Sequence, residues 1–433
     1  MKRLLLVELN EFSVELFSKA SSLLKLPGIT RLLSMNHTFT WTDDNVERQG
    51  LDPWVQWVSV HSGVDSSEHR IKHLGDIPQL STRQLWEELS ERGLSCGVWG
   101  AMNAARGGAS NCRFFLPDPW TYSEQAYPEK LNALLDFPRY YSKNYLDIDK
   151  RVALNGLLRL VWFVITSGAL LSILRRVPLI LKGILRFGLS SHVLFSVFDL
   201  VLTQIFIRYK KVERTQFSLI FLNSIAHLQH NIWVAGEPNA RCLYSIKIID
   251  CILSDLFASV GDNEEIVIMN ALSQENVAGR KDDVLYRQKN PSEFLLSTGI
   301  KYLKVEQLMT NDSHVIFDTA VDAEKAYSAL KLAEVNGDKM FDVDYDKKTP
   351  FKLFFQFSLW KRIPQSATFN LNGKCYRFYD HFEAVVTRTG EHIQQGDVYT
   401  STLKLPPKMY NHKMYHSIVK FFKELQEDDF LVE

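Results

Sequence analysis

The sequence predicts an α/β fold: a mainly parallel central sheet with helices on both faces, interrupted by a helical, apolar and basic insertion. Short apolar runs alternate with helical stretches in the first part of the chain, which is the pattern of βα units. A segment near the middle has a different composition and breaks this alternation. The chain has 433 residues, about three times the length of an average domain, so one large elaborated domain or two domains are expected.

The elements of the first part follow one another closely. A helix is expected over residues 80–93, because Ser81 and Thr82 can cap its start and Gly93 can end it. The apolar run 94–99 comes directly after it, and a helix followed at once by a buried strand indicates a parallel sheet. The other expected elements are a strand at 3–9, a helix at 13–24, an apolar run at 54–60 that ends at the turn signal Ser62-Gly63, and buried strands at 217–222 and 265–269.

The composition excludes several classes of protein. Hydrophobic residues make up 46% and charged residues 23% of the chain, which excludes a disordered or fibrous protein. Fifty basic and fifty acidic residues cancel, so no nucleic-acid partner is expected. The five cysteines form no C-x-x-C pair, which argues against a disulfide framework and for a reducing compartment. Four apolar residues precede Glu8, fewer than the roughly 7–15 of a signal-peptide core, and we therefore expect a cytoplasmic protein.

The apolar and basic insertion has three interpretations. Residues 150–211 hold ten Lys or Arg and a single acidic residue, Asp199. A membrane span needs roughly 20 apolar residues, but the uncharged stretch 160–174 is shorter and 187–207 has Asp199 inside it. A basic amphipathic hairpin on the anionic inner face of a membrane fits the charge and the Phe, Trp and Leu content. A helical cap packed on the sheet domain also fits, and the two latter interpretations are compatible.

This insertion sets the expected division of the chain. Residues 1–149 are expected to form the first part of the α/β core, 150–212 the insertion, and 213–433 the remainder of the core. The last part is expected to contain strands at 352–360 and 376–389 and a final helix at 410–425.

Histidines and carboxylates are densest between Asp52 and Asp76. Three histidines fall within thirteen residues there, His61, His69 and His73. Histidine is the usual proton shuttle near neutral pH and a common metal ligand. Their spacing matches no compact metal-ligand motif, so a catalytic pocket and a surface loop with satisfied histidines both remain open.

A second cluster follows the expected strand 217–222. His227 and His230 lie three residues apart, so on a helix they share one face. Ligands of open α/β sheets bind at the carboxyl ends of the strands, which favours a metal or phosphate contact here; polar capping of the sheet edge is the alternative. His392, in a turn-rich stretch, is a weaker candidate of the same kind.

The order of these segments resembles the alkaline phosphatase superfamily, most closely its type I phosphodiesterase and nucleotide pyrophosphatase branch. The start, Leu4-Leu-Leu-Val-Glu-Leu-Asn10, is similar to the family's first strand, with Asn10 in the place of its terminal aspartate. The family's Asp-x-x-x-His motif falls on Ala226–His230, and its Ser-Asp-His-Gly motif falls on 270–274. Two further segments, 61–71 and 85–99, match in order, so that the resemblance covers 1–120 and 213–280, with a fainter match around His392.

The resemblance implies two divalent metals, zinc or manganese, held by aspartates and histidines, and a Thr or Ser nucleophile. This chain departs from that set. The nucleophile position falls at or near Pro53, which has no hydroxyl, and Ala226 replaces a carboxylate. The Asp-His pair is replaced by Ala271 and Leu272, so that His230 and His392 are the remaining metal-ligand candidates. Two imidazoles cannot hold two divalent cations tightly, and the ordinary dinuclear mechanism is not expected.

The resulting hypothesis is an alkaline phosphatase-like enzyme with a rebuilt site, acting on a phosphate-containing or lipid-linked glycan substrate in cell-surface polysaccharide biosynthesis. Asp52 or His61 would be the general base. The expected catalytic residues are Asp52, His61 and His69, and the expected substrate-binding residues are Asn10, Gln56, Arg70 and His227. Two alternatives stay open: a non-catalytic protein that binds a phosphorylated or glycosyl ligand or scaffolds a membrane-associated complex, and an intact metal-dependent phosphodiesterase.

Overall fold

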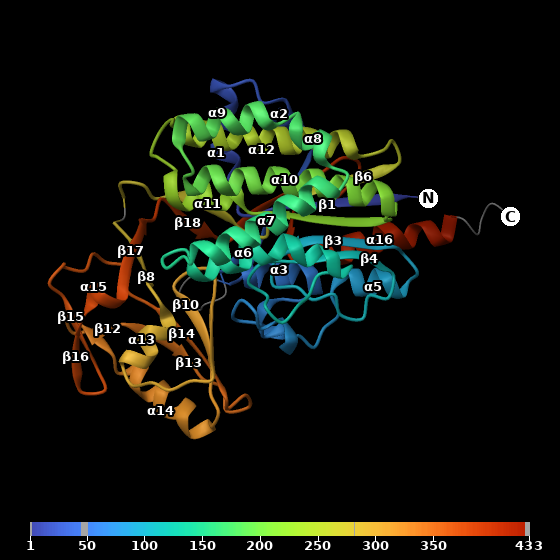
Figure 1. Ribbon diagram of the computed structural model, residues 1–433. Coiled ribbons are helices and arrows are strands. Elements are labelled where there is room, and N and C mark those ends of the chain that lie inside the picture. The colour runs from blue at the N-terminus through green and yellow to red at the C-terminus, as the bar shows by residue number, and fades with distance from the viewer. Residues whose placement is uncertain (1, 45–50, 281, 429–433) are drawn as a thin grey trace. The chain divides into compact units, whose positions relative to one another are not determined.

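The computed structural model describes residues 2–44, 51–280 and 282–428, and the chain forms two compact units (Figure 1). The first unit consists of Met1–Leu135, Leu158–Val277 and Thr389–Glu433. The second consists of Asp136–Leu157 and Ala278–Arg388. The structure thus groups residues 278–388 into a unit with its own core, where the sequence led us to expect a continuation of the parallel sheet domain.

An eight-stranded sheet forms the centre of the first unit, in the order β20-β2-β19-β6-β1-β5-β3-β4. The strand β1 lies between β5 and β6 and is parallel to both, and β3 continues the parallel order next to β5. β19 is antiparallel to both of its neighbours. The strands are β1 (Arg3–Leu9), β2 (Asn36–Trp41), β3 (Cys96–Ala101), β4 (Cys112–Pro117), β5 (Phe217–Leu222), β6 (Glu264–Met269), β19 (Gln395–Thr400) and β20 (Lys408–Tyr410). The predicted mainly parallel α/β sheet is confirmed.

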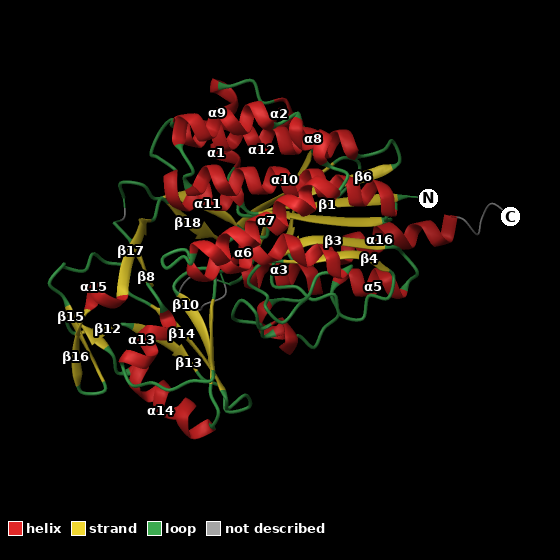
Figure 2. Cartoon of the chain, in the orientation of Figure 1, coloured by secondary structure: helices red, strands yellow, loops and turns green. Residues whose placement is uncertain are grey.

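Helices cover both faces of this sheet (Figure 2). The residues of β1 and β5 are buried on both sides, which is why these strands are continuous Leu, Ile, Val and Phe runs rather than alternating ones. The helices of the first unit are α1 (Val14–Leu23), α2 (Pro27–Leu33), α3 (Pro53–Ser62), α4 (Ser66–His69), α5 (Leu85–Glu91), α8 (Leu170–Leu174), α9 (Val177–Phe187), α10 (Ser191–Glu213), α11 (Ser224–Ile232), α12 (Ala240–Ser259) and α16 (Lys413–Asp428). Two short strands, β7 (Ser273–Asn276) and β18 (Gly390–Ile393), pair beside the sheet.

The helix α10 is a core helix, although it is the one described helix that is long and apolar enough to span a membrane. More than half of its most apolar window, 56%, is buried inside the protein. The carboxylate of Asp199, near the middle of the helix, accepts hydrogen bonds from the backbone N–H groups of Asn223 (3.0 Å) and Ser224 (2.7 Å). Asp199 therefore caps the first turn of α11, which explains an acidic residue inside an apolar helix.

The second unit has its own sheets and its own aromatic core. Its sheets have the orders β13-β14-β10-β9 and β12-β11-β15-β16, with β8 and β17 as a separate antiparallel pair. Phe294, Phe355 and Phe382 are fully buried in this core. The elements are β8 (Val284–Gln288), α13 (Pro291–Ser297), β9 (Lys304–Gln307), β10 (Asp312–Ile316), α14 (Ala320–Lys331), β11 (Glu334–Val335), β12 (Asp338–Lys339), β13 (Phe341–Asp344), β14 (Lys352–Phe357), β15 (Thr368–Leu371), β16 (Lys374–Arg377), α15 (Phe378–His381) and β17 (Phe382–Thr387). The helices α6 (Ala133–Asn144) and α7 (Lys150–Thr166) cross from one unit to the other.

Candidate functional site

Three side chains of the first unit converge at the carboxyl ends of the central strands. The Oε2 atom of Glu11 lies 3.0 Å from Nε2 of His230 and 3.1 Å from Nε2 of His392. The two Nε2 atoms are 3.3 Å apart. The structure thus brings together the two histidines that the sequence singled out as metal ligands, and adds Glu11, which the sequence analysis missed. We call these three residues the Glu-His-His cluster.

Separate elements of the fold supply the members of this cluster. Glu11 follows the end of β1 and has a left-handed backbone, with φ 58°. His230 lies in the last turn of α11, which follows β5. His392 lies on β18, opposite Gln274 of β7, which follows β6. Because β5, β1 and β6 are parallel neighbours, the segments that leave their carboxyl ends meet at one edge.

Backbone carbonyls fix the orientation of both imidazoles. His230 donates from Nδ1 to the carbonyl oxygen of Gly390 (3.3 Å), and His392 donates from Nδ1 to that of Leu51 (2.9 Å). A carbonyl oxygen can only accept, so each Nδ1 carries the proton. Each Nε2 atom faces the Glu11 carboxylate. A protonated Nε2 donates to this carboxylate, and a deprotonated Nε2 offers its lone pair to a cation, so the carbonyl contacts orient both rings as possible metal ligands.

The Glu11 carboxylate is held by its neighbour. Asn10 donates from Nδ2 to Glu11 Oε1 (2.9 Å) and also to Oδ1 of Asn223 (2.8 Å), and its own Oδ1 accepts from the Trp57 indole (2.8 Å). Burial raises the pKa of the Glu11 carboxyl, but His392 and His230 outweigh this effect and hold the pKa well below its usual range. Asn10 is almost fully buried, and both the nitrogen and the oxygen of its amide make hydrogen bonds within the protein. Its side chain therefore orients Glu11, which is a different role from the substrate contact that the sequence predicted.

A buried amide completes the surroundings of the cluster. Gln274 is 2% exposed, and its Nε2 donates to Glu11 Oε2 and lies 2.9 Å from Nε2 of His230. Its Oε1 has no hydrogen-bond partner among the described residues. A Cβ atom at Gly390 would lie 2.0 Å from this Oε1, so only glycine leaves room for the amide. A half-turn of the amide would present its oxygen to the cluster as a further ligand.

These residues fit one divalent cation and do not fit two. Two imidazole nitrogens and one carboxylate oxygen, all within 4.8 Å of one another, form the three-ligand set of a catalytic zinc site with an open position. The four positions that the resemblance of the sequence matched to further metal ligands carry no anionic side chain. They are Asn10, Ala226, Ala271 and Leu272.

His61 does not belong to the cluster. Its side chain is 1% exposed, and its Nε2 lies 2.7 Å from Oε1 of Glu8. Glu8 lies on β1 and is fully buried. Trp57 and Trp86 lie against the imidazole ring. Burial raises the pKa of the Glu8 carboxyl, although His61 acts in the opposite direction. The predicted role as general base is therefore corrected: His61 is one half of a buried core pair that a substrate does not reach.

His69 and Arg70 have structural contacts. Nδ1 of His69 accepts from the backbone N–H of Ile71 (3.0 Å), so its Nε2 donates to Oγ of Ser59 (3.0 Å). Burial lowers the pKa of His69 to about 4, and the neutral ring joins two segments rather than moving protons. Arg70 is exposed and ends α4 with a left-handed backbone, φ 60°. Neither residue touches the Glu-His-His cluster in the contacts described.

The remaining predicted binding residues, Gln56 and His227, also make structural contacts outside the Glu-His-His cluster. Gln56 is fully buried; it donates to Asp44 (2.6 Å) and accepts from Asn411 (2.7 Å), and so ties α3 to two neighbouring segments. His227 stacks on Phe195 with ring centres 3.8 Å apart, and burial lowers its pKa to about 4. It shares α11 with His230, but it packs into the protein instead of joining the cluster.

Asp52 is the predicted catalytic residue that lies beside the cluster. Its Oδ1 is 4.0 Å from Nδ1 of His392, and its side chain is 37% exposed. Pro53 begins α3 directly after it, so the predicted nucleophile position carries no hydroxyl. The exposed carboxylate of Asp52 can accept a proton from a molecule bound near His392, whereas a covalent intermediate at Pro53 is excluded.

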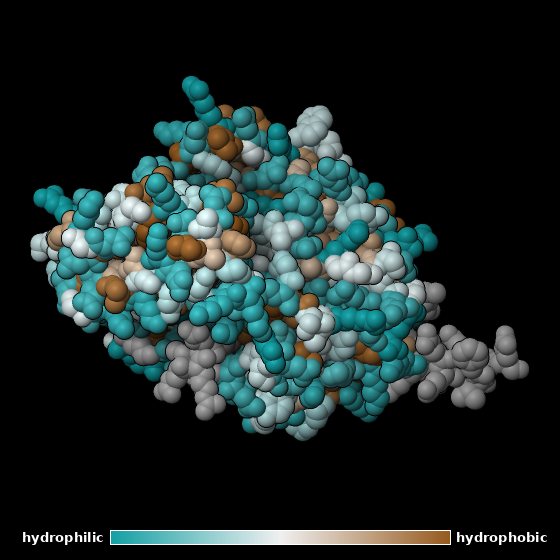
Figure 3. Space-filling model, turned by 90° about the horizontal axis from the view of Figure 1, so that it is seen from below, coloured by the Kyte–Doolittle hydropathy of each residue, from teal (hydrophilic) through white to brown (hydrophobic). Residues whose placement is uncertain are grey.

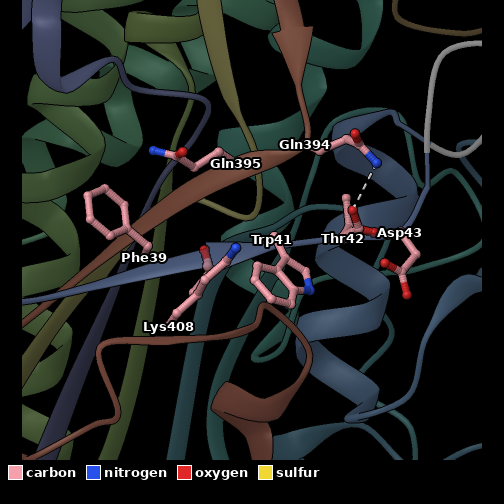
Figure 4. A pocket seen from close by; sticks show the side chains of 8 residues that line it. Phe39, Trp41, Thr42, Asp43, Gln394, Gln395 and Lys408 are labelled. Carbon is pink, nitrogen blue, oxygen red and sulfur yellow. Dashed lines mark hydrogen bonds between the residues drawn. The ribbon is translucent and has the colours of Figure 1, made fainter.

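A cavity of about 550 Å³ opens at the edge of the sheet near the end of β18 (Figure 4). Gln394 follows β18 and donates to the carbonyl oxygen of Thr42 (3.1 Å), and the ammonium group of Lys408 lies 3.5 Å from the centre of the Trp41 ring. The cavity is lined by Phe39, Thr40, Trp41, Thr42, Asp43, Gln394, Gln395 and Lys408. Sequence analysis did not predict it, because its residues come from three strands, β2, β19 and β20, and the loops beside them, and carry no motif.

No protein-family model and no curated protein matches this sequence. Among solved structures, phosphonoacetate hydrolase from Sinorhizobium meliloti 1021, in complex with phosphonoformate, is 12% identical, with 96% of each chain covered and a TM-score of 0.46. Human ectonucleotide pyrophosphatase/phosphodiesterase 5 is 9% identical, with 98% of this chain and 95% of that chain covered and a TM-score of 0.46. These proteins are of the alkaline phosphatase superfamily and its nucleotide pyrophosphatase type, the family that the sequence resembles, and at such identity the likeness concerns the fold alone.

Proposed function

We propose that this protein is a hydrolase-type enzyme that binds one divalent cation through the Glu-His-His cluster and acts on a phosphate-containing substrate. One observation carries the proposal: the Nε2 atoms of His230 and His392 and a Glu11 oxygen meet within 3.0–3.3 Å, while both Nδ1 atoms donate to backbone carbonyls. A cation bound there would polarise a phosphoryl oxygen and lower the pKa of a bound water molecule.

Other residues of the chain orient the metal ligands and act as the general base. Asn10 and Gln274 hold the Glu11 carboxylate, and the carbonyls of Gly390 and Leu51 hold the imidazoles, so the ligands are preorganised. Asp52 is the general base, because its carboxylate is partly exposed and next to His392. With Pro53 at the start of α3, water rather than a protein hydroxyl is the nucleophile.

As the specific substrate we propose a lipid-linked glycan that carries a phosphate group, in cell-surface polysaccharide biosynthesis. The cavity of Figure 4 supports the glycan part, because aromatic faces, amides and charged groups together suit a hydroxyl-rich, flat ring. The basic and apolar composition of residues 158–190 supports a lipid-proximal substrate.

Metal content is the first test of the proposal. The purified protein is dialysed without chelator and its metals are measured by elemental mass spectrometry, beside Glu11→Gln, His230→Ala and His392→Ala. We expect about one zinc or manganese ion per chain, lost in the three variants. His416→Ala, which changes an exposed histidine outside the cluster, is the matched control and should keep the metal. Metal far below one per chain in the wild type would overturn the proposal, and about two would show a dinuclear site instead.

Catalysis is tested on the same proteins and on Asp52→Asn, with phosphomonoester, phosphodiester and phosphonate substrates. Hydrolysis that disappears in His230→Ala and Asp52→Asn, but not in His416→Ala, supports the enzyme. One bound metal with no hydrolysis of any of the three classes would contradict the catalytic part and leave a non-catalytic ligand-binding protein.

A further inference from the structure

The helices α8 and α9 present an apolar stripe to solvent. Leu171 and Leu174 lie three residues apart on α8, and Leu181 and Leu185 lie four residues apart on α9, so each pair shares one side of its helix. Leu189 follows the end of α9. All are exposed, Leu185 to 86% and Leu171 to 75%. These five leucines are called the leucine stripe below.

The opposite side of the same segment is buried. Leu179, Ile180 and Ile184 pack against the core of the first unit. Gly183 lies so close to Tyr244 of α12 that a Cβ atom there would come within 2.0 Å of its hydroxyl oxygen. α9 thus packs against the core on one side, while its exposed residues include both leucines, Leu181 and Leu185, and cations, Lys182 and Arg186. In the described parts of the chain, nothing covers the leucine stripe.

The charged residues of the segment that carries the stripe are all positive. Residues 158–190 include five cations and no acidic residue. Arg175, Lys182 and Arg186 are exposed and alternate with the leucines of the stripe. On α7, Trp162 is 68% exposed and Arg159 is exposed with it. Interleaved cations and leucines with an exposed tryptophan are typical of helices that lie in the interface of an anionic bilayer.

We propose that the leucine stripe, together with Arg175, Lys182 and Arg186, docks this protein on the surface of an anionic lipid bilayer. The charge selects this occupant: a second copy of the chain would place two cationic stripes against each other, which costs energy, while anionic headgroups match them. The segment lies on the surface and does not span, because α9 has 11 residues and a span needs roughly 20. The proposal does not depend on the Glu-His-His cluster.

Vesicle co-sedimentation of the full-length protein tests this proposal. The probes are phosphatidylcholine vesicles with and without 30% phosphatidylglycerol, at low and at high salt. We expect the wild type to sediment with the anionic vesicles, and to bind them roughly tenfold less at high salt or without phosphatidylglycerol. Leu181→Gln/Leu185→Gln and Arg175→Gln/Lys182→Gln/Arg186→Gln should each lower binding at least roughly tenfold.

Matched controls change the same residue types elsewhere. Leu296→Gln/Leu332→Gln changes two exposed leucines, and Lys25→Gln/Lys301→Gln/Lys374→Gln changes three exposed lysines, and both should bind like the wild type. Circular dichroism melts confirm that every variant is folded. The proposal is overturned if the stripe variants bind as well as their controls, or if the wild type binds no vesicle. A wild-type dimer in solution that Leu181→Gln/Leu185→Gln converts to monomer would also overturn it, in favour of a second copy.

Discussion

Asn10 donates a hydrogen bond of 2.9 Å to the carboxylate of Glu11, the next residue along the chain, and both side chains are almost fully buried. In the resembling family an aspartate that holds a metal occupies the place of Asn10. Here a neutral amide stands at this position and hydrogen-bonds to the carboxylate of the following residue. Glu11 has a left-handed backbone conformation, with φ 58°.

Replacing Asn10 with aspartate should destabilise the protein. In Asn10→Asp, a carboxylate would replace an amide that donates to Glu11 and Asn223, and two anions would face each other in a buried space. We expect the metal-free protein to lose about 2–3 kcal/mol of unfolding free energy, measured by urea denaturation with chelator present. Asn231→Asp, on the less buried part of α11, should cost much less. An unchanged stability would show that Asn10 does not hold Glu11.

Gly390 should tolerate no larger residue. A Cβ atom at this position would lie 2.0 Å from Oε1 of Gln274 and 2.8 Å from the backbone oxygen of Gln229. Gly390→Ala is expected to cost about 1–3 kcal/mol and to lower metal binding, because it displaces the amide beside the cluster. Gly261→Ala is the control, since nothing lies within 4 Å of its Cβ position. Equal melting temperatures for the two variants would contradict this account.

His227 makes stability depend on pH. Its pKa is lowered to about 4, below the value of about 6.5 in an unfolded chain, so the unfolded state binds the proton more readily. The contribution of the neutral ring is complete above pH 6.5 and is lost as the pH falls towards 4. In His227→Phe, which keeps the stacking on Phe195, we expect a gain over wild type of about 2 kcal/mol at pH 5 and little change at pH 7.5. If the difference in unfolding free energy between the variant and the wild type were the same at pH 5 and pH 7.5, the lowered pKa of His227 would be contradicted.

Asp199 should influence the position of His230, and through it metal binding, without contacting the cluster. It accepts hydrogen bonds from the backbone N–H groups of Asn223 and Ser224 at the start of α11, the helix whose last turn carries His230. Asp199→Ala should cost about 1–2 kcal/mol and weaken metal binding without touching a ligand. Asp199→Asn, which keeps one acceptor oxygen, should lose less of both. If Asp199→Ala bound metal like the wild type, the cap would have no influence on the site.

The buried pair of Glu8 and His61 should affect stability and leave the chemistry unchanged. His61→Ala leaves Glu8 buried without its partner, and we expect a loss of about 3–5 kcal/mol in unfolding free energy. Glu8→Gln/His61→Leu, which removes the charge, should recover much of this loss. Metal content and any hydrolysis should be the same in the double variant and the wild type. A selective loss of hydrolysis in a folded variant would restore the catalytic role that the sequence suggested.

Four strands of the central sheet, β1, β3, β5 and β6, could be predicted from the sequence because they are short apolar runs. The other four were not predicted, and β2 and β19 among them carry several polar residues. Helix 80–93 and strand 94–99 correspond to α5 (Leu85–Glu91) and β3 (Cys96–Ala101). The second unit could not be separated in this way. Its strands are short and its core is built by aromatic residues such as Phe294 and Phe382, which meet only in three dimensions.

The candidate site was predictable in part. His230 and His392 followed from the family pattern, but Glu11 did not, because that pattern has its carboxylate at position 10. An acidic residue two positions after the end of a buried strand was the signal that could have identified Glu11. His61 and His69 were misleading for the opposite reason: their sequence neighbours are polar, but the structure places both rings in contact with buried partners, Glu8 and Ser59.

Positions 11, 230 and 392, which form the Glu-His-His cluster, are spread over nearly the whole length of the chain. During synthesis on the ribosome, the last of them is made only after residues 278–388 of the second unit. A chain that ends before position 392 therefore lacks the complete cluster, and a cation held by all three side chains would mark a polypeptide whose synthesis has passed this position.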